Sequence, residues 1–234
     1  MWVIKHKYEI SFARVCVNDI LSALNNDNIS VLLLLDLSAA FDTLDHQILL
    51  SRLNSVFGIQ STALQWFHSY LSDRYQSTSV SNSSSSPSQL MYGVPQGSVL
   101  GPILFVLYTT PLSHTIANHS VNHQLFTDDT QLQKSAPRNE VTNLTKELNV
   151  CTDNIKTWMT ENQLKLNDNK TEALLFPFSS SLKPSTGPLP DSITLGSHNI
   201  PISDSARNLG FILDSKLSKK KHIIKSLPNC LFQA

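Results

Sequence analysis

The sequence lacks two features that would place the chain in a specialised class of protein. Its 18 basic and 18 acidic residues cancel, so no whole-chain field attracts nucleic acid, and any such contact must be local. Its three cysteines, Cys16, Cys151 and Cys230, lie far apart and have no zinc-ligand spacing. This pattern excludes a disulfide framework and favours reduced thiols in an intracellular compartment.

Long hydrophobic runs are absent as well. The longest apolar stretch, VLGPILFVLY at 99–108, is too short to span a bilayer and contains Pro102, so it predicts a buried helix. The start, MWVIKHKYEI, has no apolar segment after its basic residues and does not resemble a secretory signal. We therefore expect no membrane partner. With 234 residues, 41% of them hydrophobic, the chain can bury the core of one large or two small globular domains.

What the sequence does contain is an alternation of helical and strand patterns. Apolar residues at helical spacing predict helices over 8–25, 43–57, 60–72, 98–110 and 138–160. Apolar runs and alternation predict strands over 31–36, on both sides of a turn in 123–133, in a final hairpin over 164–176, and over 192–200 and 207–213. YQSTSV and QLMYGVPQG are predicted strands joined by the serine-rich loop SNSSSSPS.

Carboxylates mark the ends of two predicted strands. HQLFTDDTQLQ, at 123–133, sets Asp128 beside Asp129, and like charges in contact require a nearby cation or full solvation. Asp36 ends the apolar run VLLLLD, which is typical of a strand buried on both faces. Taken alone, Asp36 is more often a helix or turn cap than a catalytic residue, and an Asp-Asp pair is more often a solvated turn. Asp42 and Asp45 are predicted to be structural, at the start of a helix.

Five stretches, in this order, resemble the palm motifs of reverse transcriptases from non-LTR, LINE-type retrotransposons. They are LLLLDLSAAFDTLDH, YGVPQGSVLGPILFVLYTTPL, FTDD, NQLKLNDNKTEALLF and NLGFILDS, and the similarity runs from about residue 8 to about residue 225. The resemblance implies an RNA-directed DNA polymerase with an α+β, polymerase palm-like fold, in which helices pack on one face of a mostly antiparallel sheet. It also implies an RNA template, a DNA primer and deoxynucleoside triphosphates as partners, and residence in the nucleus or the cytoplasm.

The physics of phosphoryl transfer agrees with this resemblance. Two divalent cations about 4 Å apart stabilise the charge that develops on the attacking, leaving and equatorial oxygens. Asp36, Asp128 and Asp129 are the predicted catalytic residues and metal ligands, provided that their strands are neighbours in one sheet. Mg²⁺ suits so sparse a ligand set, with Mn²⁺ as the alternative ion. Asp129 is less well placed than Asp128, because consecutive side chains in a strand face opposite ways.

Four further residues are predicted to bind the nucleotide. Phe41 matches a family aromatic beneath the incoming sugar, where an apolar ring leaves no room for a 2′-hydroxyl and selects deoxynucleotides. In VPQGS, Gln96 would line the pocket and Gly97 would let substrate approach the backbone. Lys170 matches a family lysine proposed to help protonate the leaving pyrophosphate. Core packing, a plain turn and a solvated lysine are the respective alternatives.

The resemblance suggests a division of the chain. We expect an N-terminal helical remnant of the fingers or palm edge over 1–30, the palm core over 31–176, a Pro/Ser-rich loop over 177–191, a small hairpin at the palm–thumb junction over 192–215, and a basic tail from a truncated thumb over 216–234. With so little fingers and thumb, we expect this fragment to be inactive alone as a processive polymerase. Its basic cluster (Lys216, Lys219, Lys220, Lys221 and Lys225) is either a phosphate contact or a solvated face.

Two departures from the family pattern, the small extent of fingers and thumb and a changed residue beside the aspartate pair, leave alternatives open. Thr127 stands where the family usually has alanine, which adds a hydroxyl and a β-branch beside the predicted metal site. The chain would then be either a catalytic piece of a reverse transcriptase or an inert remnant of a decayed element that keeps the palm fold and at most binds metal or nucleic acid. An unrelated magnesium-dependent phosphohydrolase is a third, weaker hypothesis, which no histidine motif supports.

Overall fold

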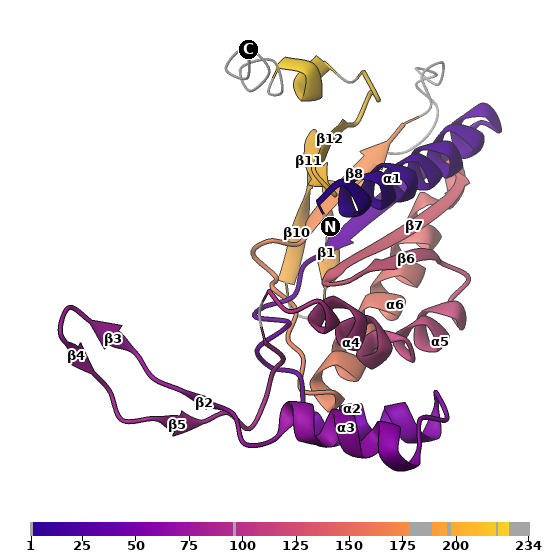
Figure 1. Ribbon diagram of the computed structural model, residues 1–234. Helices are drawn as coiled ribbons and strands as arrows, with labels where there is room; N and C mark the ends of the chain where they lie inside the picture. Colours follow the sequence, from indigo (N-terminus) through magenta and orange to yellow (C-terminus); the bar gives the residue numbers. More distant parts are fainter. Residues whose placement is uncertain (1, 96, 178–188, 196–197, 219, 225–234) are drawn as a thin grey trace.

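The computed structural model describes residues 2–95, 97–177, 189–195, 198–218 and 220–224 (Figure 1). Its helices are α1 (Trp2–Asn25), α2 (His46–Ser55), α3 (Ser61–Leu71), α4 (Leu100–Thr109), α5 (Leu112–Ala117) and α6 (Val141–Glu161), with a 3-10 turn at Arg138–Glu140. Its strands are β1 (Asn28–Leu35), β2 (Tyr75–Gln76), β3 (Ser79–Val80), β4 (Ser83–Ser84), β5 (Ser88–Gln89), β6 (Asn122–Phe126), β7 (Asp129–Pro137), β8 (Glu172–Phe176), β9 (Ser192–Leu195), β10 (His198–Ser203), β11 (Ser205–Asn208) and β12 (Phe211–Asp214).

Strand β1 lies at the centre of the main sheet. In the described part of the chain this sheet has six strands in the order β6-β7-β1-β8-β10-β9. β1 pairs antiparallel with β7 on one side and with β8 on the other, and only the short β10–β8 pairing is parallel. Leu32 and Leu33, consecutive residues that point to opposite faces, are both fully buried. The apolar run therefore forms a strand covered on both faces, as predicted.

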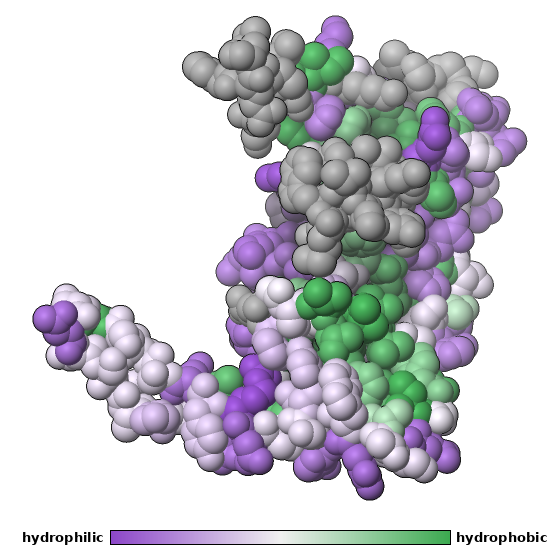
Figure 2. Space-filling view, viewed as in Figure 1, coloured by the Kyte–Doolittle hydropathy of each residue, from purple (hydrophilic) through white to green (hydrophobic). Residues whose placement is uncertain are grey.

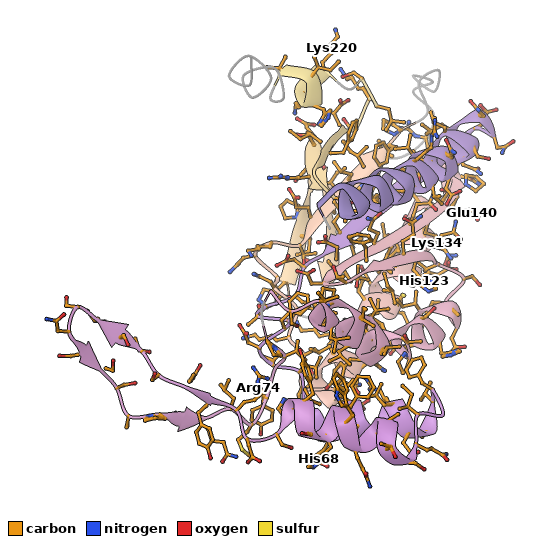
Figure 3. All side chains as sticks on the ribbon, in the orientation of Figure 1. His68, Arg74, His123, Lys134, Glu140 and Lys220 are labelled. Carbon is orange, nitrogen blue, oxygen red and sulfur yellow. The ribbon has the colours of Figure 1, made fainter. Side chains whose placement is uncertain are left out.

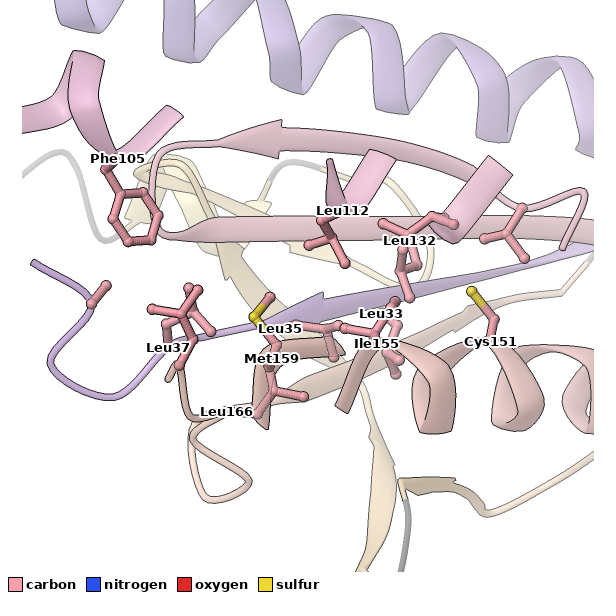
Figure 4. Packing of buried hydrophobic residues seen from close by; sticks show 14 of the residues in the cluster. Leu33, Leu35, Leu37, Phe105, Leu112, Leu132, Cys151, Ile155, Met159 and Leu166 are labelled. Carbon is pink, nitrogen blue, oxygen red and sulfur yellow. The ribbon is translucent and has the colours of Figure 1, made fainter. Parts of the chain in front are cut away.

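The two faces of the sheet pack against different helices. On one face, Leu33 and Leu35 of β1 meet Ile155 and Met159 of α6 in a core that also contains residues of α2 and α4 (Figure 4). On the other face, Leu32 packs with α1 in a smaller cluster. Each fully buried leucine contributes about 1.5–3 kcal/mol relative to an exposed one. The predicted α+β class with a mostly antiparallel sheet is confirmed; α2 and α6 contribute to one face as expected, and α1 covers the other.

Arg52 of α2 joins three helices on the α6 side of the sheet. Its guanidinium donates hydrogen bonds to the carbonyl oxygen of Tyr108 in α4 and to Oδ1 of Asn162 directly after α6. The guanidinium carbon also lies 4.6 Å from the centroid of the Tyr108 ring and 5.2 Å from that of Trp158. Burial lowers the pKa of Arg52 from its usual value. A charged side chain thus holds the helices beneath the sheet together.

The predicted hairpin over 164–176 is wrong in its first half. Only Glu172–Phe176 forms a strand, and Leu166 makes a single bridge to Leu37. No hairpin forms because β8 pairs with β1 instead of with residues 164–167. The side chains of Leu164 and Leu166 pack in the core. The stretches predicted as single strands over 192–200 and 207–213 correspond to two antiparallel pairs, β9–β10 and β11–β12.

Residues 75–89 form an arm that projects away from the rest of the molecule (Figure 1). Two short antiparallel pairs, β2–β5 and β3–β4, build it. The predicted strand in YQSTSV is present as β2 and β3, but their partners β4 and β5 lie in the serine-rich stretch up to Gln89, and the strand predicted over QLMYGVPQG does not continue beyond Gln89. Every residue of the arm is exposed. Figure 2 shows few hydrophobic side chains on the arm, whereas they gather on the body. The arm therefore has no core of its own.

The apolar stretch around 99–108 forms a helix, as the sequence predicts, but only one side of it is buried, since Val99, Ile103 and Val106 are exposed. By length and composition alone, Leu100–Ala117 would suffice to span a membrane. The segment is broken between α4 and α5 near Pro111, and Leu104, Phe105 and Tyr108 are fully buried in the core. Its hydrophobicity is thus used for packing within the fold.

Candidate active site

Two of the three predicted catalytic aspartates meet at one end of the sheet. The last pair between β1 and β7 is Leu35 with Thr130, so Asp36 and Asp129 are the next residues along the two antiparallel strands. Asp128 is the second residue of the two-residue turn Thr127–Asp128, which the pair of Phe126 with Asp129 closes. The prediction that the strand ending at Asp36 lies beside the Asp128 hairpin is confirmed. Because β1 is buried on both faces, its position is fixed, and so is the position of Asp36 at its end.

Lys170 lies against Asp36. Its ammonium nitrogen Nζ is 3.6 Å from Oδ2 of Asp36. That oxygen is buried and has no hydrogen-bond partner among the described residues, although the Asp36 side chain as a whole is 27% exposed. The Lys170 ammonium is therefore the cationic group that faces this oxygen, whose capacity to accept a hydrogen bond is otherwise unused among the described residues. The structure thus brings together two residues that only the motif resemblance had linked.

The backbone explains why Lys170 reaches this position. The Asn167 N–H donates to the carbonyl of Asp36 at 2.9 Å, and the Ser38 N–H donates to the carbonyl of Lys165 at 2.8 Å. The Lys170 N–H closes a turn onto the Asn167 carbonyl at 3.0 Å. The segment after α6 therefore runs along the residues that follow β1, and its turn delivers the lysine to the aspartate.

Thr127 has a backbone conformation that is rare for a β-branched residue. Its φ is +51°, in the left-handed region. Its hydroxyl Oγ1 lies 2.7 Å from the Phe126 carbonyl oxygen and 2.9 Å from Oδ1 of Asp128, and its single proton is donated to one of the two at a time. The hydroxyl that replaces the usual alanine thus contacts a predicted metal ligand. Within the described ranges, no three His, Cys, Asp or Glu side chains gather closely enough to form a complete metal site.

Phe41 and the loop before α4 lie against each other. The Val94 N–H donates to the Phe41 carbonyl at 2.9 Å, and the Phe41 ring is 5.2 Å from the ring of Phe105 in α4. Gly97 has φ +78°, and open space lies where a Cβ atom would stand. The predicted nucleotide residues Phe41 and Gly97 therefore come from adjoining segments. Gln96, Lys219, Lys225 and Cys230 lie outside the described residues, as does most of the predicted Pro/Ser-rich loop.

Sequence reasoning missed Gly93 and the two side chains that hold it. Gly93 is buried with φ +80°, and a Cβ atom there would lie 2.9 Å from backbone atoms of Phe41 and Asp42. Its carbonyl accepts hydrogen bonds from His46 and Arg74. The glycine in YGVPQG was a usable signal, whereas the donors are 47 and 19 residues away in sequence.

Other predicted residues have structural positions. Asp45 is the N-cap of α2, and its carboxylate accepts from the N–H groups of Gln47 and Ile48, as expected of a structural residue. The Asp42 N–H closes a turn onto Ala39. Lys216, Lys220 and Lys221 are exposed, and Nζ of Lys221 donates to Ser205. These contacts leave both explanations of the basic cluster open.

Comparisons with known proteins bear on this site. The family model described as "Reverse transcriptase (RNA-dependent DNA polymerase)" matches residues 7–213. The "Probable RNA-directed DNA polymerase from transposon BS" of Drosophila melanogaster is 29% identical over 216 residues, which are 90% of this chain and 23% of the relative. The "RNA-directed DNA polymerase from mobile element jockey" of the same species is 28% identical over 212 residues, or 88% of this chain and 22% of the relative. The chain thus spans less than a quarter of the length of these relatives.

Solved structures share the fold at low sequence identity. Apo telomerase from Candida tropicalis, truncated from its C-terminal domain, matches with a TM-score of 0.56 and 14% identity over 90% of this chain and 38% of that one. Telomerase from Candida albicans matches with a TM-score of 0.51 and 13% identity over 91% of this chain and 38% of that one. At such identity the likeness shows the fold alone, an α+β polymerase palm-like architecture.

Proposed function

Because the chain belongs to the reverse transcriptase (RNA-dependent DNA polymerase) family, we propose that it is the catalytic palm of a non-LTR retrotransposon polymerase, which copies an RNA template onto a DNA primer. The observation that carries the proposal is the pairing of β1 with β7, by which Asp36 follows β1 beside Asp129 and the Thr127–Asp128 turn. The partners are the template, the primer and deoxynucleoside triphosphates. Asp36, Asp128, Asp129 and Lys170 are all present, so the site gives no reason to prefer an inert remnant.

The family depends on divalent metal ions in general, and carboxylate oxygens are the ligands that such ions prefer. The Oδ2 of Asp36 is buried, accepts no hydrogen bond from a described residue and lies 3.6 Å from the Lys170 ammonium, so it is an oxygen that a hard cation would take as a ligand. We propose that Asp36, Asp128 and Asp129 hold two Mg²⁺ ions, or Mn²⁺ as the alternative, with water and substrate phosphates as the remaining ligands. When bound, the two ions stabilise the charge on the reacting phosphate oxygens.

The protein side chains would position the nucleotide. Phe41 would lie beneath the sugar and exclude a 2′-hydroxyl, while Gln96 and the open backbone at Gly97 would line the approach of the nucleotide. Lys170, which contacts Asp36, would turn its ammonium group toward the leaving pyrophosphate. The palm core of 31–176 would thus contain every proposed site residue.

A single-turnover extension assay tests the proposal. The chain of residues 1–234 is given an RNA template, an annealed DNA primer, one complementary deoxynucleotide and Mg²⁺. We expect template-directed addition of one nucleotide that requires Mg²⁺ and falls by about a hundredfold or more in Asp36→Asn and Asp128→Asn, since each removes a metal ligand. Asp42→Asn is the matched control and retains extension. Equal extension by all four proteins, or none by the unmodified chain, would contradict the proposal.

A further inference from the structure

The carbonyl oxygen of Gly93 is held by two side chains from distant parts of the sequence. Nε2 of His46, the first residue of α2, lies 2.8 Å from it, and Nη1 of Arg74, directly before β2, donates to it at 2.9 Å. A carbonyl only accepts, so Nε2 of His46 carries the proton. Both lone pairs of this buried carbonyl are therefore used. Figure 3 shows Arg74 where the arm leaves the body.

The same residue is also fixed through its N–H and its Cα. The Gly93 N–H donates to the Leu44 carbonyl at 2.8 Å, and the next N–H, of Val94, donates to the Phe41 carbonyl at 2.9 Å. A side chain at position 93 would collide at 2.9 Å with the backbone of Phe41 and Asp42. The segment before Gly97 is thus locked onto the turn that bears Phe41, and His46 and Arg74 supply the only side-chain hydrogen bonds to Gly93 among the described contacts.

We infer that His46 and Arg74 are positioning residues for nucleotide selection. Acting through the Gly93 carbonyl, they set the gap between the Phe41 ring and the Gly97 loop, the two segments proposed to bind the nucleotide. The inference rests on the proposed function and extends it to two side chains that touch neither metal nor nucleotide. A ring that excludes one hydroxyl group works only at a fixed distance, and a displacement of about 1 Å can cost about a hundredfold in such a site.

The structure also gives Arg74 a second task, which the test must separate. Its own carbonyl accepts from the Leu90 N–H at 2.8 Å, so Arg74 anchors the base of the arm through its backbone as well. Substitution of the Arg74 side chain leaves that backbone bond in place. His46 has no contact of this kind with the arm. The same effect in His46 and Arg74 variants therefore reports on the Gly93 carbonyl and not on the arm.

The experiment compares donor-removing with donor-keeping variants. His46→Leu and Arg74→Met remove the hydrogen bonds, whereas His46→Gln and Arg74→Lys keep a donor of similar reach. His68→Leu, at an exposed residue of α3, is the control, because the hydrogen bond of its ring among the described residues is with Ser72 and not with Gly93. Equilibrium dialysis measures the Kd of radiolabelled dATP and ATP for each chain, with Mg²⁺ and a template–primer that has a dideoxy terminus. Hydrogen exchange of the Gly93 and Val94 amides is followed in the same proteins.

We expect the ratio of the ATP Kd to the dATP Kd to fall by about tenfold in the donor-removing variants and to stay near the unmodified value in the other three. The amides of Gly93 and Val94 should exchange at least about tenfold faster in the donor-removing variants, while those of β1 stay protected. An unchanged ratio in variants that bind dATP would overturn this inference and leave the proposed function intact. No Mg²⁺-dependent dATP binding by the unmodified chain would contradict the proposed function, and this inference with it.

Discussion

The end of β1 next to Asp36 and the arm are held in position by different interactions. Asp36 follows a strand whose residues Val31, Leu32 and Leu33 are fully buried, so the core sets its position. The arm over 75–89 has no buried residue, and four pairs of residues in two-residue strands hold it together. The comparison shows that this fold places its carboxylates by packing and its arm by a few backbone bonds at the base. Side-chain substitutions in the two regions should therefore lower the free energy of unfolding by very different amounts.

The largest contrast is expected between core and arm. Leu33→Ala removes a fully buried side chain between β7, β8 and α6 and should lower the free energy of unfolding by about 2–5 kcal/mol. Val80→Ala, at an arm residue that is 68% exposed, should change it by less than about 0.5 kcal/mol. Urea unfolding of both variants gives the two values. Equal costs would mean that the arm packs in solution and that the comparison is false.

The next largest change in the free energy of unfolding is expected for Arg52, a charged residue within the packed region. Arg52→Met keeps most of the side-chain volume but leaves the Tyr108 carbonyl and Asn162 Oδ1 without their donor, which should cost about 2–3 kcal/mol. Arg207→Met, at an exposed residue of β11, serves as the control and should cost less than about 0.5 kcal/mol. The same unfolding measurement applies. A stabilised Arg52→Met protein would show that hydrophobic packing alone suffices beneath the sheet.

Helix capping beside the site should have a smaller effect. Asp45→Ala removes two hydrogen bonds at the start of α2 and should cost about 1 kcal/mol. The matched variant is Gln60→Ala, because Gln60 caps α3 without a side-chain hydrogen bond and its loss should cost less than about 0.3 kcal/mol. Thermal denaturation of the pair resolves the difference. If the two variants lose equal stability, the Asp45 contacts do not stabilise α2.

The smallest effect concerns the thiol on the α1 face of the sheet. Burial, and secondarily Asp19, raises the pKa of Cys16 to about 12. The folded state thus keeps a proton that the unfolded state loses above about pH 9, so this contribution is present below pH 9 and is lost between about pH 9 and 12. Between pH 7 and 9.5 the unmodified chain should lose about 0.8 kcal/mol more stability than Cys16→Ala. Parallel pH dependences would mean that the thiol is accessible to water.

The sequence predicts those features that depend on local pattern. The run before Asp36 predicts a doubly buried strand, and the two aspartates within alternating residues predict a hairpin turn, because both signals lie within a few neighbours. The partner of β8 was not predictable in the same way. Leu164 and Leu166 have a strand pattern, but their side chains are taken up by the core, and β1 accepts β8 from a distance. Pairing between strands far apart in sequence is a property of the whole sheet.

The residues of the candidate site also fall into those that a local motif predicts and those that only long-range contacts reveal. Asp36, Asp128 and Lys170 were predicted from motifs. Backbone hydrogen bonds between 36–38 and 165–167 bring the segment of Lys170 beside Asp36, and the pairing of β1 with β7 brings the hairpin of Asp128 to the same end of the sheet. Gly93, His46 and Arg74 escaped notice, because a carbonyl that accepts two side-chain hydrogen bonds leaves no periodic trace in sequence. What long-range hydrogen bonds assemble becomes visible only in three dimensions.

Mn²⁺ binding, followed by electron paramagnetic resonance on the chain of residues 1–234, tests the central claim most directly, because it does not require polymerisation. If the end of β1 and the hairpin turn form one metal site, Asp36→Asn and Asp128→Asn should each weaken Mn²⁺ binding by about 10–100-fold, and Asp42→Asn should leave it unchanged. Mg²⁺ should compete for the same site and raise the melting temperature of the unmodified chain. Equal Mn²⁺ affinity in all four proteins would contradict the claim that these carboxylates share a metal.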